Sequence, residues 1–401
     1  MNWLIAILFL VIGCGSNNVS TSNESGSTDT SLDSSLDSSA LKGGKPPKAD
    51  PTPTPVAPQD LPSSVIALGS YVLPQAMAMN PVTKQLCVSF FNYIIKGQSE
   101  LKYGCLNGST WEIQSLGFKG GDYGPSSMNM KFDSAGHPTI AFSNTWESGT
   151  NNGHLWVVSS DGLSWKTESL DFDTGAPLVA MGPNGKKYIS YLASAPGGAL
   201  IYLAENSGTG WTTSAVDDSN VAGGTRYEGN PSIAVDNLGN VAVTYTYYII
   251  GYTKQVRYAY RSNGVWKIST LHYNIGGSTA LVFDSSNRPQ VFFKPDEGLY
   301  AARADALGNW SKELVPNINA ITFLGSLSLD SNGAAFMSVF NYGPGDLQLV
   351  SGTSGNYTNQ LLAGTGTVGK SNSLVIDPAT NKKYVSFTDE SLKQLRLITL
   401  P

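Results

Sequence analysis

The side chains in this sequence best suited to hold a ligand are aromatic and acidic, and they lie in variable segments between short apolar runs. Tyrosine and tryptophan offer a large contact area with a polar handle, and they lose little conformational entropy on binding. Aromatic faces flanked by carboxylates suit sugars or peptides. The alternative is that these side chains are ordinary exposed loop surface. We predict the following ligand-contact residues: Tyr123, Trp146, Glu147, Arg226, Tyr227, Glu228, Tyr248, Tyr252 and Tyr342.

Catalytic chemistry has less support in the residue types present. Glycoside hydrolysis needs two carboxyl groups at a set separation, and Glu147 and Glu228 are candidates for such a pair. The chain has 3 histidines, too few to favour a His-based triad or a metal cluster. No phosphate loop or dinucleotide fingerprint occurs. We predict a protein that is not an enzyme and has no catalytic residues, cofactor or metal. The alternative is a divergent glycan-acting hydrolase or lyase.

The composition favours one large all-β fold. Of the 401 residues, 41% are hydrophobic and only 14% are charged, so there is enough apolar material for a sizeable core. The 43 glycines and 19 tyrosines suit many short strands joined by tight turns. The net charge is -5 and no basic patch occurs, which argues against nucleic acid as a partner.

The chain from residue 64 onward repeats one pattern. Each unit has an alternating apolar strand, a turn rich in Asp, Asn and Gly, two further strands, and a Gly-containing turn before an aromatic residue and a fourth strand. Four strands per repeat of about 40–50 residues is typical of propeller blades. We therefore predict a seven-bladed β-propeller with four-stranded antiparallel blades over residues 64–401. The first residues of the seven turns lie 46 to 54 positions apart: Asn80, Asp133, Gly182, Asp236, Asp284, Asp330 and Asp377.

The last unit is incomplete, because the chain ends after its third strand, residues 395–398. An apolar segment at residues 65–73 precedes the first unit. Pairing this segment with the last blade would close the ring and cover an exposed strand edge. We predict that residues 65–73 complete the last blade. The alternative is that they are the tail of a linker.

Two cysteines fall in the first unit, Cys87 in its second strand and Cys105 in its third. A hairpin loop centred on Lys96 would place them directly opposite each other, within disulfide range. Such a bond would contribute roughly 3 kcal/mol in the chain-entropy model. We predict a structural disulfide, and the alternative is two buried free thiols.

The repeated polar and aromatic positions have structural explanations. In the turns, Asp or Asn is expected to accept hydrogen bonds from the turn backbone, and Gly to supply a positive φ. Calcium is the alternative, but it needs six to eight converging oxygens and these turns are spread around the ring. The aromatic residue before each fourth strand is expected to pack between blades: Trp111, Trp165, Trp211, Trp266, Trp310 and Tyr357.

This repeat pattern resembles the sialidase-like propellers with Asp-box repeats. Residues 159–165, Ser-Ser-Asp-Gly-Leu-Ser-Trp, are the nearest match and are one residue short of the usual box. The resemblance covers about residues 64–401 and implies the propeller fold. A sialidase also needs several arginines around the substrate carboxylate. Only Arg226 is well placed for this, and the departure argues against sialidase activity.

The N-terminus is a targeting segment. An apolar run at residues 3–12 is too short to span a bilayer. Val11-Ile12-Gly13-Cys14 resembles the lipobox of bacterial lipoproteins, which implies a cleaved signal peptide over 1–14 and lipidation of Cys14. No Lys or Arg precedes the run, which departs from that pattern. The alternatives are a signal peptide with a chance Cys, or an uncleaved anchor.

A tether follows the lipidation site. Residues 15–63 are Ser/Thr-rich and then Pro-rich, and are predicted to be disordered. A flexible tether of this length spans roughly 35–40 Å. The expected location is the cell envelope, at the outer membrane or the cell surface.

The predicted ligand face follows from propeller geometry. Loops between second and third strands share a face with the connections between blades, and these loops vary here. Variable loops on a rigid scaffold commonly carry function. We predict a monomeric, lipid-anchored binding or scaffold protein with a glycan or protein ligand on this loop face, which contacts the membrane through its lipid alone.

Overall fold

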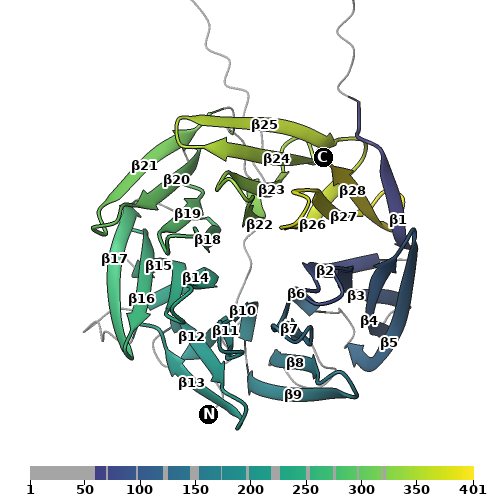
Figure 1. Cartoon of the computed structure of the whole chain (residues 1–401), viewed down its shortest axis with the longest axis horizontal. Helices are drawn as coiled ribbons and strands as arrows, with labels where there is room; N and C mark the ends of the chain where they lie inside the picture. Colours follow the sequence, from purple (N-terminus) through teal and green to yellow (C-terminus); the bar gives the residue numbers. More distant parts are fainter. Residues whose placement is uncertain are drawn as a thin grey trace, which may run out of the picture. The chain divides into compact units, whose positions relative to one another are not determined.

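The computed structural model describes residues 59–68, 71–95, 98–120, 125–144, 153–172, 174–195, 198–217, 226–249, 253–273, 277–295, 298–316, 318 and 322–401. Ala57–Pro401 form one compact unit. Its strands build a ring of seven antiparallel blades, so the predicted all-β propeller is confirmed (Figure 1). Cys14, the signal segment and nearly all of the tether lie outside the described residues. Within the described ranges, no helix is long and apolar enough to cross a bilayer.

Each blade starts with the strand nearest the ring axis and ends with the strand at its rim (Figure 1). The first three blades contain β2 (Tyr71–Met79), β3 (Leu86–Ile95), β4 (Gln98–Asn107) and β5 (Thr110–Gly120); β6 (Pro125–Phe132), β7 (Pro138–Asn144), β8 (His154–Ser160) and β9 (Trp165–Phe172); and β10 (Thr174–Met181), β11 (Lys187–Ala195), β12 (Gly198–Asn206) and β13 (Trp211–Ala215). Blades 4 and 5 contain β14 (Arg226–Val235), β15 (Val241–Ile249), β16 (Gln255–Ser262) and β17 (Val265–Tyr273); and β18 (Thr279–Phe283), β19 (Pro289–Phe293), β20 (Leu299–Ala304) and β21 (Trp310–Val315). Blades 6 and 7 contain β22 (Thr322–Leu329), β23 (Ala335–Asn341), β24 (Asp346–Thr353) and β25 (Asn356–Ala363); and β26 (Val368–Ile376), β27 (Lys383–Asp389), β28 (Gln394–Leu400) and β1 (Ser63–Leu68).

Strand β1 closes the ring by pairing antiparallel with β28, with Ser64 opposite Leu397 and Leu68 opposite Gln394. Ring closure by an N-terminal segment is therefore confirmed. The predicted extent of that segment needs correction, because positions 71–73 belong to β2, the innermost strand of blade 1. The apolar pattern runs through both strands and hides the break between them. Contacts with the propeller also begin before residue 64, since the Leu61 amide donates to the Leu362 carbonyl in blade 6.

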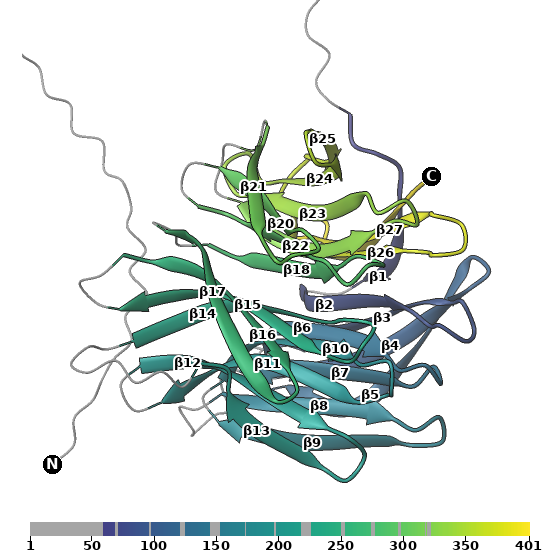
Figure 2. The same cartoon turned by 60° about the vertical axis from the view of Figure 1, so that its left-hand side comes forward.

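Blades 3 and 4 are joined into one hydrogen-bonded sheet. Strand β12 pairs antiparallel with β13 along most of its length. At its start, Gly198 and Ala199 pair in parallel with Arg226 and Tyr227 of β14, and β12 and β14 lie close together in Figure 2. This contact gives one blade boundary a main-chain connection in addition to its side-chain packing.

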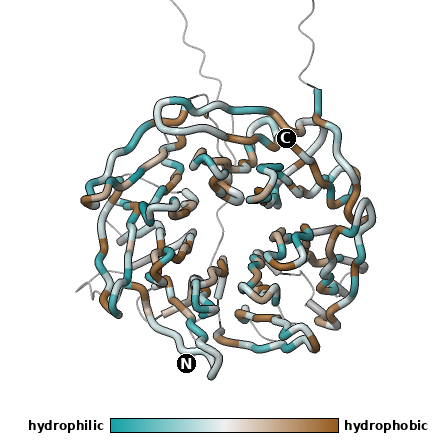
Figure 3. Tube along the Cα trace, viewed as in Figure 1, coloured by the Kyte–Doolittle hydropathy of each residue, from teal (hydrophilic) through white to brown (hydrophobic). Residues whose placement is uncertain are grey.

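Hydrophobic residues recur along the strands of the ring, as the hydropathy colouring of the chain trace shows (Figure 3). They form seven buried clusters in the described chain, one at each boundary between neighbouring blades. The cluster between blades 7 and 1, for example, contains Ile66, Phe90 and Leu395. The ring therefore depends on seven separate hydrophobic interfaces rather than on one central core.

The repeated aromatic residue of the fourth strand packs onto the preceding blade, as predicted. The Trp165 ring meets Tyr103 edge-on at 5.1 Å between centroids, and Trp310 meets Tyr258 at 4.9 Å. The other members of the set take part in the boundary clusters in the same way. Their recurrence is explained by packing between blades.

The innermost strands bend at irregularities in their pairing, and prolines occupy several of them. In blade 1, the register between β2 and β3 shifts between Val72 and Gln75. In blade 3, the register between β10 and β11 shifts between Gly175 and Leu178. Pro74 and Pro177 fall inside these shifts. Proline donates no hydrogen bond, so it is tolerated at a bulge or on a strand edge facing the ring axis.

The Asp turns are closed by their own carboxylates, which confirms the structural interpretation of this motif. In blade 4, Asp236 Oδ1 accepts the amides of Leu238 and Asn240 at 2.9 and 2.8 Å. Gly239 has φ of 86°, a left-handed conformation that favours glycine. The carboxylate and the glycine together explain the Asp-x-x-Gly spacing without any bound ion.

Three turn carboxyls predict a dependence of stability on pH: Asp377 in the Asp turn of blade 7, and Asp161 and Asp305 in turns between third and fourth strands. Backbone and side-chain donors lower the pKa of three turn carboxyls: the Ser164 amide acts on Asp161, the Asn309 side chain on Asp305 and the Thr380 hydroxyl on Asp377. A carboxyl with a lower pKa in the folded state stabilises the fold above its unfolded pKa of about 3.9. This stability is lost as pH falls through the folded pKa values.

The measurement is the urea midpoint of unfolding between neutral pH and pH values below the ordinary carboxyl range. A variant carrying Asp161→Asn, Asp305→Asn and Asp377→Asn should lose less stability on acidification than the unsubstituted protein. If the urea midpoints of the two proteins fell equally on acidification, these carboxyls would not contribute to the pH dependence of stability.

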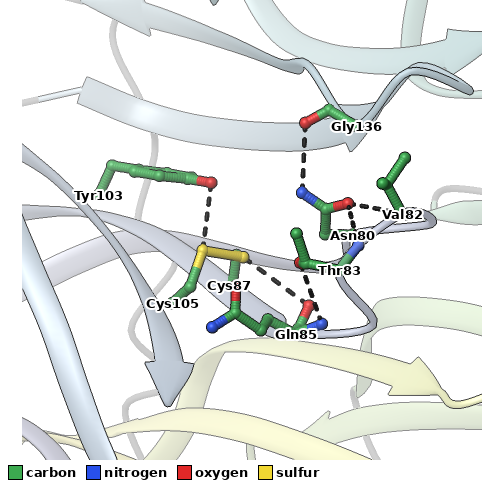
Figure 4. Close-up of a disulfide and its surroundings, with 8 residues drawn as sticks. All are labelled: Asn80, Val82, Thr83, Gln85, Cys87, Tyr103, Cys105 and Gly136. Atoms are coloured by element: carbon green, nitrogen blue, oxygen red, sulfur yellow. Dashed lines mark hydrogen bonds between the residues drawn. A yellow bond between two sulfur atoms is a disulfide. The ribbon is translucent and has the colours of Figure 1, made fainter. Parts of the chain in front are cut away.

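The predicted disulfide is present. Cys87 on β3 and Cys105 on β4 are direct cross-strand partners, and their sulfur atoms lie 2.06 Å apart (Figure 4). The Tyr103 hydroxyl lies 3.2 Å from the Cys105 sulfur, and burial raises the pKa of Tyr103 to about 12. The bond ties two neighbouring strands of blade 1 beside its boundary with blade 2, which supports a structural role.

Candidate functional site

The innermost strands of all seven blades surround a central channel with a volume of about 300 Å³. Its wall combines apolar residues with hydroxyl and amide side chains. No Asp, Glu, His or Arg is among the described residues that line it. The polar lining residues are Gln75, Ser127, Asn129, Lys131, Ser232, Ser278, Thr279, Ser326, Asn372 and Ser373.

Several of these polar side chains connect one blade to the next. Asn129 lies four residues before the turn of blade 2, and its Oδ1 accepts the Val179 amide of blade 3 at 3.1 Å. The equivalent Ser232 accepts the amide of Leu281 in blade 5 at 3.0 Å. Ser373 of blade 7 bonds blade 1 in the same way. Part of the polar wall is therefore structural, because it satisfies backbone groups on the open edges of the innermost strands.

Lys131 differs from the rest of the wall. It lies two residues beyond Asn129 on β6, and alternation along a strand places both side chains on the same side. Its ammonium has no hydrogen bond or ion pair with any residue that the structure describes. The Lys131 side chain is exposed in the channel, yet the protein around it partly excludes water, and this desolvation lowers the pKa of its ammonium. At the same position, two residues before the turn, the other blades carry small or medium side chains: Ala78, Ala180, Ala234, Val282, Ser328 and Val375.

A second polar cluster lies at the boundary of blades 3 and 4. Asp217, just after β13, is buried, and its Oδ2 accepts bonds from Arg257 Nη1 at 2.7 Å and the Tyr245 hydroxyl at 3.1 Å. In the opposite direction, Glu228 of β14 accepts the Ile201 amide of blade 3 at 2.6 Å. Blades 3 and 4 thus each contribute a buried carboxylate that accepts hydrogen bonds from the other blade.

The same cluster controls the ionisation of Tyr245. Burial raises the pKa of its hydroxyl, and the nearby Glu228 and Asp217 carboxylates raise it further. Tyr245 is therefore a neutral hydrogen-bond donor at physiological pH, which is the state that its bond to Asp217 requires. This arrangement is suited to holding two blades together.

Most of the predicted ligand face lies outside the described residues. Tyr123, Trp146, Glu147 and Tyr252 are in this part of the chain. Arg226 and Tyr227 are described only through their backbone, which forms the parallel contact with blade 3. Their ligand contacts remain predictions.

Three of the predicted contact residues have described side chains. Glu228 is buried between blades, which favours a structural role for it. Tyr248 is half-buried, and the Lys254 ammonium lies 5.5 Å from its ring centroid. Tyr342, in the loop between β23 and β24, is 59% exposed and available to a ligand.

A larger groove of about 560 Å³ lies at the boundary of blades 4 and 5. Two of its polar side chains are engaged within the protein: the Tyr260 hydroxyl donates to Asp236, and Arg288 pairs with Asp284 at 2.8 Å. The channel is the stronger candidate site, because all seven blades contribute to its wall and the Lys131 ammonium has no partner among the described residues. No group of three or more His, Cys, Asp or Glu residues suited to a metal occurs in the described ranges.

The sequence interpretation missed Lys131 and Asn129. Aligning the seven units on their turns reveals Lys131, because it is the one charged residue at its position in the repeat. That signal was available in the sequence, whereas the absence of a partner for Lys131 is visible only in the fold.

No protein-family model matches the sequence, and no curated protein matches it significantly. Several solved structures resemble the propeller. Polysaccharide lyase Uly1 has a TM-score of 0.55 at 8% identity, covering 84% of this chain and 90% of that one. Virginiamycin B lyase from Staphylococcus aureus has a TM-score of 0.54 at 11% identity, covering 85% and 99%. The Hadza microbial sialidase Hz136 has a TM-score of 0.51 at 11% identity, covering 79% and 73%.

At these identities the likeness shows the fold alone. The class of protein is thus a seven-bladed β-propeller, and the similarity to a sialidase agrees with the resemblance in the repeat pattern at the level of fold.

Proposed function

We propose that this chain is an exported, lipid-anchored protein that binds a glycan on the loop face of its propeller, with one sugar unit reaching into the central channel. The channel is the observation that supports this best. Its volume of about 300 Å³ is at the lower end of small-molecule sites. Its hydroxyl and amide side chains come from six of the seven blades and match the donors and acceptors of sugar hydroxyl groups.

Export and anchoring in this proposal come from the N-terminal sequence. Cys14 would carry the lipid, and the Ser/Thr- and Pro-rich segment would hold the propeller away from the membrane. The exposed Tyr342 adds an aromatic surface at the loop face for stacking against a sugar ring.

The test is a glycan array probed with the purified protein, followed by titration of the best ligand. Tyr342→Ala should weaken binding roughly two- to tenfold, because aromatic contacts contribute about 0.5–1.5 kcal/mol. Leu307→Ala is the matched control, since Leu307 is 87% exposed in a turn on the opposite face. It should leave the affinity unchanged.

Other outcomes separate the alternatives. Turnover of a bound glycan that disappears in Glu147→Gln would replace binding with the hydrolase or lyase function. Absence of binding across the array, together with co-purification with outer-membrane barrel proteins, would contradict glycan recognition and support a scaffold role.

A further inference from the structure

The channel contains one charged side chain and, beside it, one oriented neutral donor. Asn129 Oδ1 accepts the Val179 amide, and this bond fixes which end of the side-chain amide is oxygen. Asn129 Nδ2 therefore faces away from that bond, and it has no partner among the residues that the structure describes. Lys131 follows two positions later on the same side of β6.

This pair offers only donors to the channel. An ammonium and an amide N–H₂ both need acceptors, and a bound anion would satisfy both at once. No carboxylate among the described lining residues competes for the ammonium. Desolvation lowers the pKa of Lys131, and an anion bound beside the ammonium would favour its charged form.

We propose that Lys131 and Asn129 form an anion subsite, which makes the preferred ligand of this propeller an acidic glycan whose terminal unit carries a carboxylate or sulfate. The glycan part of this inference rests on the proposed function, whereas the anion subsite itself does not. The uncharged hydroxyl and amide side chains between this subsite and the loop face then contact the remaining groups of the same sugar unit.

The position of the subsite within the channel limits how the glycan enters. Strand β6 runs from Pro125 at the loop face toward the Asp133 turn, so Lys131 lies near the far end of the channel. A ligand approaching from the loop face reaches it end-on. This geometry selects a chain terminus rather than the middle of a polymer.

The experiment compares galacturonic acid with galactose in titrations of the full protein. Galacturonic acid carries a carboxylate where galactose carries a hydroxymethyl group. Galacturonic acid should bind at least about tenfold more tightly. Lys131→Met should abolish this preference, and Lys131→Arg should retain it. Affinity for the acid should weaken as pH rises, because only the protonated ammonium holds an anion. Lys267→Met, the same change on the exposed rim strand β17, is the matched control and should have no effect.

A second variant tests the neutral donor. Asn129→Asp keeps the acceptor for the Val179 amide but places a carboxylate beside Lys131. It should abolish binding of the acid while circular dichroism shows an intact fold. It also covers the case in which Lys131→Met fails to fold.

The outcomes distinguish the two proposals. Equal binding of both sugars, or a preference that survives Lys131→Met, overturns the anion subsite and leaves glycan binding intact. If neither sugar binds but inorganic sulfate shifts the Lys131 side-chain resonance, the subsite holds and the glycan function fails. If neither sugar nor sulfate binds, the inference is wrong.

Discussion

Ile66→Ala is expected to lower the free energy of unfolding by about 3 kcal/mol, within the range for a buried Ile reduced to Ala. Ile66 is only 6% exposed and belongs to the cluster between blades 7 and 1, where it packs with Phe90 and Leu395. It lies on the strand that closes the ring, so losing its contacts weakens the one blade boundary formed by both ends of the folded unit. Chemical unfolding monitored by tryptophan fluorescence measures the loss.

Val65→Ala is the matched control, because Val65 precedes Ile66 on β1 but is 43% exposed. It should change stability by no more than about 0.5 kcal/mol, as exposed substitutions usually do. If the two variants lowered the free energy of unfolding equally, the contacts of Ile66 would not be what stabilises the closed ring.

Deleting Ser63–Leu68 tests the strand itself. The deletion leaves the edge of β28 without a partner, and such edges pair with other chains. We expect self-association in light scattering, at protein concentrations where the complete protein shows none. A deleted protein of unchanged size and stability would contradict a closing role for β1.

Asp217→Ala is expected to lower stability by about 3 kcal/mol, because it leaves the buried hydroxyl of Tyr245 and the largely buried guanidinium of Arg257 without their acceptor. Removing one member of a buried ion pair costs more than the pair contributes. A double-mutant cycle of Asp217→Ala and Arg257→Met should give a coupling free energy of about 2 kcal/mol, and urea unfolding of the four proteins measures it.

The Lys370–Glu390 pair serves as the reference for this cycle. Its side chains are 44% and 21% exposed, and its N–O distance is 3.0 Å. Exposed pairs contribute at most about 1 kcal/mol. If both cycles gave the same small coupling, the boundary of blades 3 and 4 would not depend on its buried charges.

The repeat architecture was predictable because it is encoded locally. Each Asp turn is closed by its own carboxylate, which accepts amides of the same turn, as Asp236 shows. Apart from β1, each strand pairs with a strand next to it in the chain, as β15 does with β16. The pairing of Cys87 with Cys105 follows from a single hairpin. Even ring closure was indicated by simple counting, because the last unit has one strand too few.

Strand limits at the closure were not predictable from the same pattern. Positions 65–73 read as one apolar segment, although β1 ends at Leu68 and β2 begins at Tyr71. An apolar pattern identifies which residues are buried, but it does not identify which sheet buries them. That assignment depends on partners more than 300 residues away, such as Leu397 opposite Ser64.

The sequence by itself determined the number of blades, the turn chemistry and the disulfide, since each depends on residues within one repeat. Only the tertiary structure decided the roles of side chains between repeats. Glu228 was predicted to contact ligand but is buried against Ile201 of the neighbouring blade, and Lys131 was not predicted but is the one unpaired charge among the described lining residues of the channel. The physical reason is that strand alternation sets the side on which a residue lies, whereas its partners belong to a neighbouring blade, as Ile201 of blade 3 does for Glu228 of blade 4.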